Sequence, residues 1–367
     1  MVHRLLFLQF TCVLIISDIV FCFEYDFRGQ FSIWANRKKN LNEWQINSGI
    51  RYIPEINIKQ SFQNESFIDT EISFNGFMST DFNTQEKDLK FYRCRLRFAT
   101  AQTETQLGLQ KINFGPALIL RSLMWFDSLD LRDPLQMTDG VYALRFKYNF
   151  LNNTNIWVWG LYGNEKTKGY EILPTTIKKP EFGGRFQFPV PYGEFASTFH
   201  TRDVNAGYFK YNESRLAFDG RWDVVLGFWF ESVLQHNNSE FLPYEWNKMI
   251  TLGSDYTFGI GNGLHVLAEY MTSISSKKTF GRDNDVQVSA LYLNYPIGFF
   301  DNVMAIGYYS WDDRKYYQYI GWQRTYDDFI FNMSLFHYPQ SERNPVSNDR
   351  ENIGAGYGAQ IMFIYNH

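Results

Sequence analysis

The stretch YDFRGQFSI, residues 25–33, alternates strictly between apolar and polar side chains. The stretch YGAQIMFIY, residues 357–365, has a similar pattern, with apolar residues at all its odd-numbered positions. Because side chains alternate across a β-strand, each segment has one apolar face and one more polar face. Roughly eighteen such segments follow one another along the chain, and no long hydrophobic run occurs after residue 21.

Tyr and Trp residues lie near the ends of these segments, which is typical of strands that cross a membrane. The sequence therefore predicts an all-β fold, a single transmembrane antiparallel β-barrel of about 18 strands. Sixteen strands remain possible if two weak early segments do not span. From Tyr357 to Tyr365 the last segment covers ~26 Å along the strand, or ~20 Å vertically at a ~40° tilt, which is close to the ~25 Å apolar band of such barrels. A soluble β-sandwich or propeller is the alternative, with its apolar faces meeting in an internal core.

Short connections rich in Gly, Asn, Asp or Pro alternate with longer ones, as expected for a barrel with both termini on the same side. The longer connections are expected at residues 115–140, 164–180, 236–244, 276–284 and 339–350. Two connections depart from the rhythm. The one at 312–315 is short where a long one is expected, and the one at 55–66 is long where a short one is expected.

The start of the chain predicts targeting. Residues 1–22 are interpreted as a secretory signal peptide, with Arg4 before an apolar stretch that is too short to span a membrane. Residues 23–367 are then one outer-membrane β-barrel domain, in which Cys94 is the sole cysteine and no intrachain disulfide can form. A net charge of -4 without a basic tail argues against a nucleic-acid partner. The sequence contains no metal-ligand spacing and no Gly-rich phosphate loop, so we expect no metal and no cofactor.

The most distinctive block is the connection at residues 116–139, which is rich in Leu, Ile, Met, Trp and Phe. A long apolar loop in a compact domain is usually functional, and the barrel interior is the obvious place to bury it. We therefore expect an inward-folded constriction loop that narrows the lumen. Pro116 at the start of a helical pattern predicts a short helix through Trp125. The alternatives are a lid packed on the barrel rim and a contact between subunits.

Basic side chains on alternate positions predict a charged lumen wall, because such side chains facing lipid would cost several kcal/mol in total. This pore-lining basic wall comprises Arg93, Arg95, Arg97, Arg145 and Lys147. The constriction loop carries the acids Asp127, Asp130, Asp133 and Asp139. One hypothesis is a constriction whose transverse field filters polar or anionic solutes. The other is that salt bridges between these groups tie the loop to the wall.

Four segments carry a resemblance to a known family: LQKINFGPA (109–117), LMWFDSLDLRDPLQMTDGV (123–141), NIWVWGLYGN (155–164) and PEFGGRFQFPVP (180–191). In these segments the chain resembles the porin-like outer-membrane barrels of the Bacteroidetes, loosely related to alginate-export and phosphate-selective porins. The resemblance implies an outer-membrane pore in a Gram-negative cell, inserted by the barrel-assembly machinery. The family's C-terminal aromatic would correspond to Phe363 or Tyr365. No substrate residue is carried over from the family.

Four functions compete at this point. The first is a porin, a channel for diffusion of small hydrophilic and possibly anionic solutes, with outer-membrane lipid as its surroundings. The second is an export barrel for an anionic polysaccharide, and the third is a structural or adhesive barrel. The fourth is a barrel enzyme, but the histidines lack an accompanying nucleophile, so we expect no catalytic residues and no enzymatic activity. Assembly into a homotrimer is left open.

Overall fold

The structure is a computed structural model that describes residues 23–40, 43–62, 65–81, 84–207, 209–239, 241–339 and 356–367. The interpreted signal peptide, residues 1–22, lies outside the described residues, as does most of the connection expected at 339–350. Eighteen strands follow one another: β1 (Phe23–Asn40), β2 (Glu43–Ser61), β3 (Phe67–Thr80), β4 (Gln85–Ala99), β5 (Thr103–Gln110), β6 (Val141–Asn149), β7 (Asn155–Leu161), β8 (Glu181–Val190), β9 (Gly193–Ala206), β10 (Phe209–Asp223), β11 (Gly227–Asn238), β12 (Trp246–Phe258), β13 (Leu264–Ser276), β14 (Asn284–Pro296), β15 (Asp301–Ser310), β16 (Lys315–Tyr326), β17 (Phe329–Tyr338) and β18 (Gly356–Asn366).

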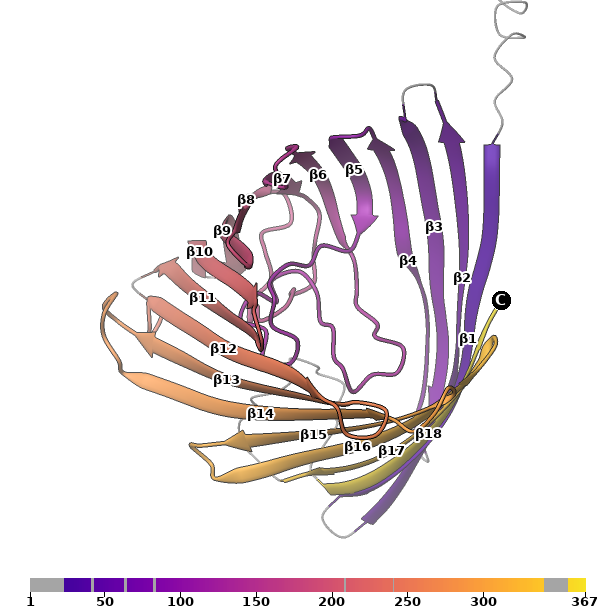
Figure 1. Ribbon diagram of the computed structural model, residues 1–367. Helices are drawn as coiled ribbons and strands as arrows, with labels where there is room; N and C mark the ends of the chain where they lie inside the picture. Colours follow the sequence, from indigo (N-terminus) through magenta and orange to yellow (C-terminus); the bar gives the residue numbers. More distant parts are fainter. Residues whose placement is uncertain are drawn as a thin grey trace, which may run out of the picture.

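The strands form one closed antiparallel barrel (Figure 1). Each strand pairs with its neighbours in sequence, and β1 pairs with both β2 and β18. Closure matters because an open sheet would leave a row of unpaired backbone groups on each edge strand. The prediction of an 18-stranded barrel is confirmed, and the alternatives of 16 strands and of a β-sandwich are wrong.

The alternation read from the sequence separates the two faces of the wall. On β6, Val141 and Ala143 are buried in the interior, whereas Tyr142 and Leu144 are about half exposed. The same holds on β18, where Met362 and Ile364 are buried and Ile361 is exposed. Large apolar side chains therefore cover the outside of the barrel, which is the arrangement that a hydrocarbon surrounding requires.

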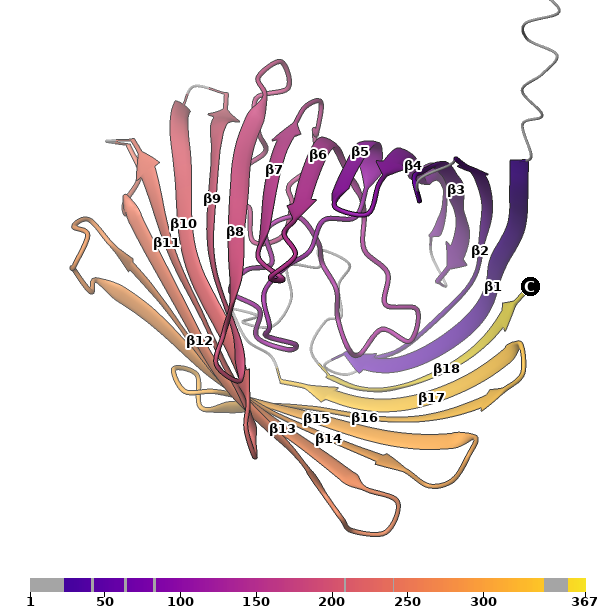
Figure 2. The ribbon, with the colours of Figure 1, turned by 45° about the horizontal axis from the view of Figure 1, so that its top comes forward.

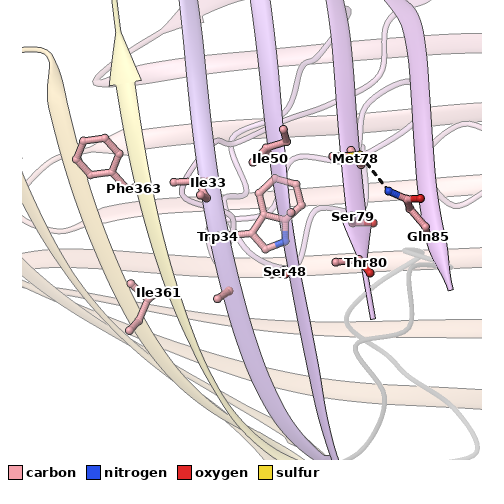
Figure 3. Close-up of a pocket in the computed structure, with 12 residues that line it drawn as sticks. Ile33, Trp34, Ser48, Ile50, Met78, Ser79, Thr80, Gln85, Ile361 and Phe363 are labelled. Carbon is pink, nitrogen blue, oxygen red and sulfur yellow. Dashed lines mark hydrogen bonds between the residues drawn. The ribbon is translucent and has the colours of Figure 1, made fainter. Parts of the chain in front are cut away.

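The outer surface is hollowed where the barrel closes (Figure 3). A groove of about 450 Å³ crosses β18, β1, β2 and β3, and small residues such as Ala35 and Ser48 line it between larger ones such as Ile33 and Phe363. The lining is predominantly apolar, so the groove continues the apolar exterior across the seam between β1 and β18.

The connections follow the expected rhythm with one correction. The long connection predicted at 55–66 is wrong, because β2 continues to Ser61 and only residues 62–66 join it to β3. The reason is that Ile56 and Ile58 continue the outward apolar row of β2, and Asn57 between them faces inward. Among the described residues, no helix is long and apolar enough to cross a membrane.

The hydrophobic core lies inside the barrel, between the wall and the residues that connect β5 to β6 (Figure 2). Phe114, Leu123, Trp125 and Phe126 of this connection pack against wall residues such as Trp159. Further along, Leu120 packs against a second cluster on β13 to β17 that includes Tyr308, Tyr317, Tyr319 and Tyr338. The interior is thus partly filled by a loop.

An arginine in place of Ile361 should destabilise the folded barrel in lipid vesicles by about 2–4 kcal/mol, because a charge at the middle of the apolar band loses its hydration. Ile361 lies at the centre of β18 and is 48% exposed on the outer face. Gln360→Arg, on the inner face of the same strand, is the matched control and should have a much smaller effect. Urea titration of the folded fraction in vesicles measures both, and equal destabilisation would argue against an apolar surrounding.

Candidate functional site

The connection at residues 111–140 folds into the barrel and crosses its interior (Figures 1 and 2). Its residues Ala117, Leu120, Leu123 and Trp125 are almost fully buried. The sequence places these apolar side chains on a chain segment with no strand partner, so burial against the inner wall is the arrangement that removes them from water. The predicted constriction loop, residues 116–139, lies within this connection, and from here on the name constriction loop refers to residues 111–140.

Two wall carboxylates hold the backbone of the constriction loop. Glu269 on β13 accepts hydrogen bonds from the backbone N–H groups of Leu118, Ile119 and Leu120, at 2.8, 3.0 and 2.5 Å. Glu231 on β11 accepts from the N–H groups of Ala117 and Leu123, at 3.0 and 2.8 Å. Five amide donors, three of them in buried hydrogen bonds, are thereby satisfied without secondary structure, which matters because an unpaired buried N–H group costs about 1–3 kcal/mol.

The strand register brings these two carboxylates together. Glu231 lies directly opposite Thr251 of β12, and Thr251 donates to the carbonyl oxygen of Leu120 at 2.7 Å. Two residues further along β12, Gly253 is paired with Trp229 of β11 on one side and with Glu269 of β13 on the other. Because a Cβ on Gly253 would come within 2.2 Å of the Trp229 ring, glycine is what lets this indole cross β12. Trp229 Nε1 then donates to Glu269 Oε1 at 3.1 Å.

The short helix predicted from Pro116 through Trp125 is wrong, because this segment forms bends and turns. In a helix, the N–H groups of Leu120 and Leu123 would bond to carbonyl groups four residues earlier. Here these N–H groups donate to the two glutamates instead. The wall carboxylates therefore compete with the helical hydrogen bonds, and the buried loop adopts the shape of the wall.

The constriction loop is also attached to two other parts of the wall. Near its middle, Arg132 pairs with Asp130, and the Arg132 carbonyl oxygen accepts a hydrogen bond from Tyr319 of β16 at 3.0 Å. Near its end, Thr138 O accepts from Arg93 of β4 at 2.9 Å, and Asp139 pairs with Lys90 at 2.8 Å. The loop is thus fixed to β4, to β11–β13 and to β16.

A second connection, residues 162–180, also folds against the inner wall. The sequence predicted a long connection here but not its inward position. Lys168 pairs with Glu181 of β8 at 2.9 Å, and Glu171 pairs with Arg202 of β9 at 3.1 Å and Arg215 of β10 at 3.4 Å. All five side chains are buried. The sequence showed only that the long connection expected at 164–180 carries charged residues, among them Lys168 and Glu171.

The two connections touch each other. Gly169 has a φ of 47°, and a Cβ at this position would lie 1.9 Å from the carbonyl oxygen of Met124. Only glycine combines this left-handed backbone with so close an approach. The second connection therefore supports the constriction loop from the side of β8–β10.

Burial shifts the pKa of two carboxyl groups in these connections. Desolvation raises the pKa of Glu171, although the neighbouring Arg202 and Lys168 act in the opposite direction. Desolvation also raises the pKa of Asp133, and the hydrogen bonds from the N–H groups of Met137 and Leu135 oppose this shift. Both carboxyl groups are therefore held by partners that favour the charged form inside a site that disfavours it.

The predicted basic wall is compensated mainly by wall acids rather than by loop acids. Arg95 contacts Glu71 at 2.6 Å, and both Arg95 and Arg97 contact Asp69. Arg145 pairs with Glu104 at 2.6 Å. These acids lie on β3 and β5, on either side of the arginine row of β4, and the register places Asp69 opposite Arg97 and Glu71 opposite Arg95.

The remaining basic positions have other partners. Arg93 donates to the carbonyl oxygens of Tyr92 and Thr138 and, within the described part of the chain, has no carboxylate partner. Lys147 lies over the Trp157 ring, with Nζ 4.9 Å from the centroid. Of the five predicted wall residues, Arg93 is thus the one with a hydrogen bond to the described residues of the constriction loop.

The predicted loop acids fall into two groups. Asp127 pairs with Arg121, Asp130 pairs with Arg132, and Asp133 accepts from backbone N–H groups, so these three act within the loop. Asp139 is the loop acid that reaches a wall base, Lys90. Among the described residues, a direct contact between a loop acid and a wall base is thus seen at this end of the loop, between Asp139 and Lys90.

Two histidines bear on the enzyme alternative. His265 Nε2 lies 3.7 Å from Asp255, while the carboxylate of Glu269 is occupied by loop amides. His200 is fully buried between Glu181 at 3.1 Å and Trp159 at 3.3 Å. Each histidine is thus held by wall side chains. The absence of enzymatic activity stays a prediction.

No family model matches this chain, and no curated protein matches it. Many solved structures do. OccAB4 of Acinetobacter baumannii is 10% identical, with a TM-score of 0.60 over 94% of this chain and 98% of that chain. The anion-selective porin of Comamonas acidovorans is 9% identical, with a TM-score of 0.55 over 94% and 100%. OmpT of Vibrio cholerae in its trimer form is 10% identical, with a TM-score of 0.54 over 94% and 99%. The chain therefore shares its fold with outer-membrane proteins, porins among them.

Proposed function

We propose that this protein is an outer-membrane channel for the diffusion of small hydrophilic solutes, with a preference for anions. The observation that carries the proposal is the constriction loop, fixed inside a closed barrel by the carboxylates of Glu231 and Glu269. A barrel of this strand number leaves an aqueous lumen unless something fills it, and a loop that crosses the interior narrows the lumen. The apolar exterior fits insertion in a membrane.

The filling of the interior favours small solutes over a polymer. Two connections, residues 111–140 and 162–180, occupy the interior, and ion pairs and hydrogen bonds hold them against the wall. An exporter of an anionic polysaccharide would need a continuous wide lumen along the whole barrel. The fixed loops therefore support the porin hypothesis over the export hypothesis.

The preference for anions rests on the wall of Arg93, Arg95, Arg97, Arg145 and Lys147, which we propose lines the pore. Most of its charge is balanced by Asp69, Glu71 and Glu104. Arg93 and Lys147 are the exceptions within the described residues, since Arg93 contacts neutral carbonyl groups and Lys147 lies over the Trp157 ring. An unbalanced guanidinium beside a constriction attracts anions more strongly than it would in open water.

The proposal includes the route to the membrane. Residues 1–22 would direct secretion in a Gram-negative cell, and the barrel-assembly machinery would insert the barrel into outer-membrane lipid. Relationship to the porin-like barrels of the Bacteroidetes and assembly into a homotrimer belong to the same proposal. The trimer form of the similar OmpT of Vibrio cholerae is compatible with such an assembly.

Arg93→Ala should shift ion selectivity toward cations, lowering the anion-to-cation permeability ratio by roughly threefold or more, because it removes an unbalanced charge beside the constriction loop. Reversal potentials in planar bilayers under a salt gradient measure the ratio. The matched control is Asp69→Asn combined with Arg97→Gln, which removes one charge of each sign and should leave the ratio near its original value. An unchanged ratio in Arg93→Ala would reduce Arg93 to a structural contact of the loop.

Glu269→Gln together with Glu231→Gln should loosen the constriction loop, because charge-assisted hydrogen bonds worth about 1.5–3 kcal/mol each become neutral ones. We expect a larger and noisier single-channel conductance and faster proteolysis within residues 111–140. Glu165→Gln, an exposed acid in the second connection, is the control and should change neither. Quiet channels of unchanged conductance in the double variant would mean that apolar packing alone fixes the loop.

A further inference from the structure

A row of small outward residues forms the floor of the groove on the outer surface. Ala35 of β1 is paired with Ser48 of β2, and Ser48 is paired with Thr80 of β3. Residues paired across antiparallel strands share one face of the sheet. A row of larger side chains borders the floor on the same face and is paired in the same way (Figure 3): Phe363, Ile33, Ile50 and Met78. We call the groove that these residues line the seam groove.

Basic side chains follow the seam groove on the same outward face. Arg37 and Lys39 lie two and four residues beyond Ala35, and both are exposed. At ~3.3 Å per residue, these positions are ~7 Å and ~13 Å from Ala35 along β1. Lys87 of β4, which is also exposed, is paired with Met78 on the other side of the groove. Each of these bases lies within three residues of the end of its strand, at the end of the barrel from which the constriction loop departs.

The ring of Trp44 holds two of these bases in place. The Arg37 guanidinium carbon lies 4.3 Å from the ring centroid, and Lys39 Nζ lies 6.0 Å from it. A guanidinium group that lies over a ring keeps its N–H groups at the edge of its own plane, where two of them can bind one phosphate. Lys39 is also paired with Tyr357 of β18. Trp and Tyr side chains at strand ends are typical of the level at which lipid headgroups begin.

The charge of these three bases is not balanced by acids of the wall. Within the described residues no ion pair joins any of them to a carboxylate, and the outward rows beside the seam groove contain no Asp or Glu. Other exposed charged side chains at this end of the barrel form ion pairs: Lys179 with Asp203, and Arg282 with Asp285. The seam groove therefore combines an apolar surface with an unbalanced positive charge.

We propose that the seam groove binds a single membrane lipid whose phosphate headgroup is negatively charged. An acyl chain would lie along the small residues of the floor. The phosphate would bind Arg37 and Lys39, with Lys87 adding to the attraction. A lipid in a bilayer has this same order, since its charged headgroup lies at the interface and its chain lies in the hydrocarbon. The inference rests on an apolar exterior that faces a membrane, and it is independent of solute passage through the lumen.

A second copy of the chain is a less suitable occupant of the seam groove. Two copies joined through the same face would bring two sets of unbalanced bases together, and like charges at a contact lower its affinity. A lipid phosphate instead supplies the opposite charge. Its flexible chain also follows a groove floored by small residues without needing a matching protein surface. The charge pattern therefore favours a lipid.

The test uses the full chain refolded in a neutral detergent, with dioleoylphosphatidylglycerol as the anionic lipid and dioleoylphosphatidylcholine as the zwitterionic one. Native mass spectrometry counts the bound lipid molecules and gives their Kd. We expect the first anionic lipid to bind at least about tenfold more tightly than the zwitterionic one. Arg37→Gln with Lys39→Gln should weaken binding of the anionic lipid by at least about tenfold, because the phosphate loses both charged donors. Lys277→Gln with Lys278→Gln, at two exposed bases of the same end of the barrel, changes the net charge equally and should stay within about threefold.

Two further arms separate a lipid from a bound ion. Ala35→Phe places a ring on the floor of the groove and leaves the bases in place, so it should also weaken binding of the anionic lipid by at least about tenfold. Excess inorganic phosphate should not displace the lipid, because it lacks the chain. Far-ultraviolet circular dichroism shows that each variant has folded, whether or not the protein conducts ions, so this test is separate from that of the channel function.

Several results would overturn the proposal. Equal affinity for the two lipids would remove the role of charge, and equal loss in the two double variants would mean unspecific attraction. Unchanged binding in Ala35→Phe, or full displacement by inorganic phosphate, would mean that the bases bind a phosphate ion alone. An oligomer that binds no lipid and dissociates in Ala35→Phe would show that the occupant is a second copy.

Discussion

The arrangement of this protein depends on how a buried loop satisfies its backbone amides. A segment without strand or helix partners can lie inside a barrel only if other groups accept its hydrogen bonds. Glu231 and Glu269 accept five of them, and Thr251 donates to a loop carbonyl group between these glutamates. The carboxylates in turn are tolerable in the interior because these donors surround them. Loop and wall are therefore mutually dependent, and neither side of the contact would be stable in its present form alone.

This dependence sets the shape of the lumen. Leu123 and Trp125 pack on the wall near Trp159, while Arg132 and Thr138 attach the loop to β16 and β4. The loop consequently crosses the interior as a fixed element. In the proposed channel, the passage lies next to the wall where β3, β4 and β5 place their paired charges. The same wall residues thus serve two purposes in the proposed channel. They give the lumen a polar lining, and their charges create the electric field that a passing ion meets.

Strands and their faces could be predicted from the sequence because a period of two is a local property. Tyr357 to Tyr365 shows its outward row without knowledge of any other strand. The inward position of the constriction loop could also be predicted, since Trp125 and its apolar neighbours must avoid water. The helix predicted from Pro116 does not form. Glu269, which accepts the loop N–H groups in place of helical carbonyl groups, lies about 150 residues away along the chain. Local propensity contains no information about an acceptor at that separation.

The charges of the wall show the same limit more sharply. The spacing of Arg93, Arg95 and Arg97 alone predicts that they share one face of the strand. Whether acids balance their charge depends on the register of β3 against β4. A shift of one residue would turn Asp69 and Glu71 to the outer face and leave the arginines unbalanced. Because a misplaced row of charges on the apolar face would cost several kcal/mol, the wall ion pairs themselves help to fix this register. In the proposed channel, selectivity and strand pairing are therefore coupled in the same residues, and a change of charge at Asp69 alone would act on both.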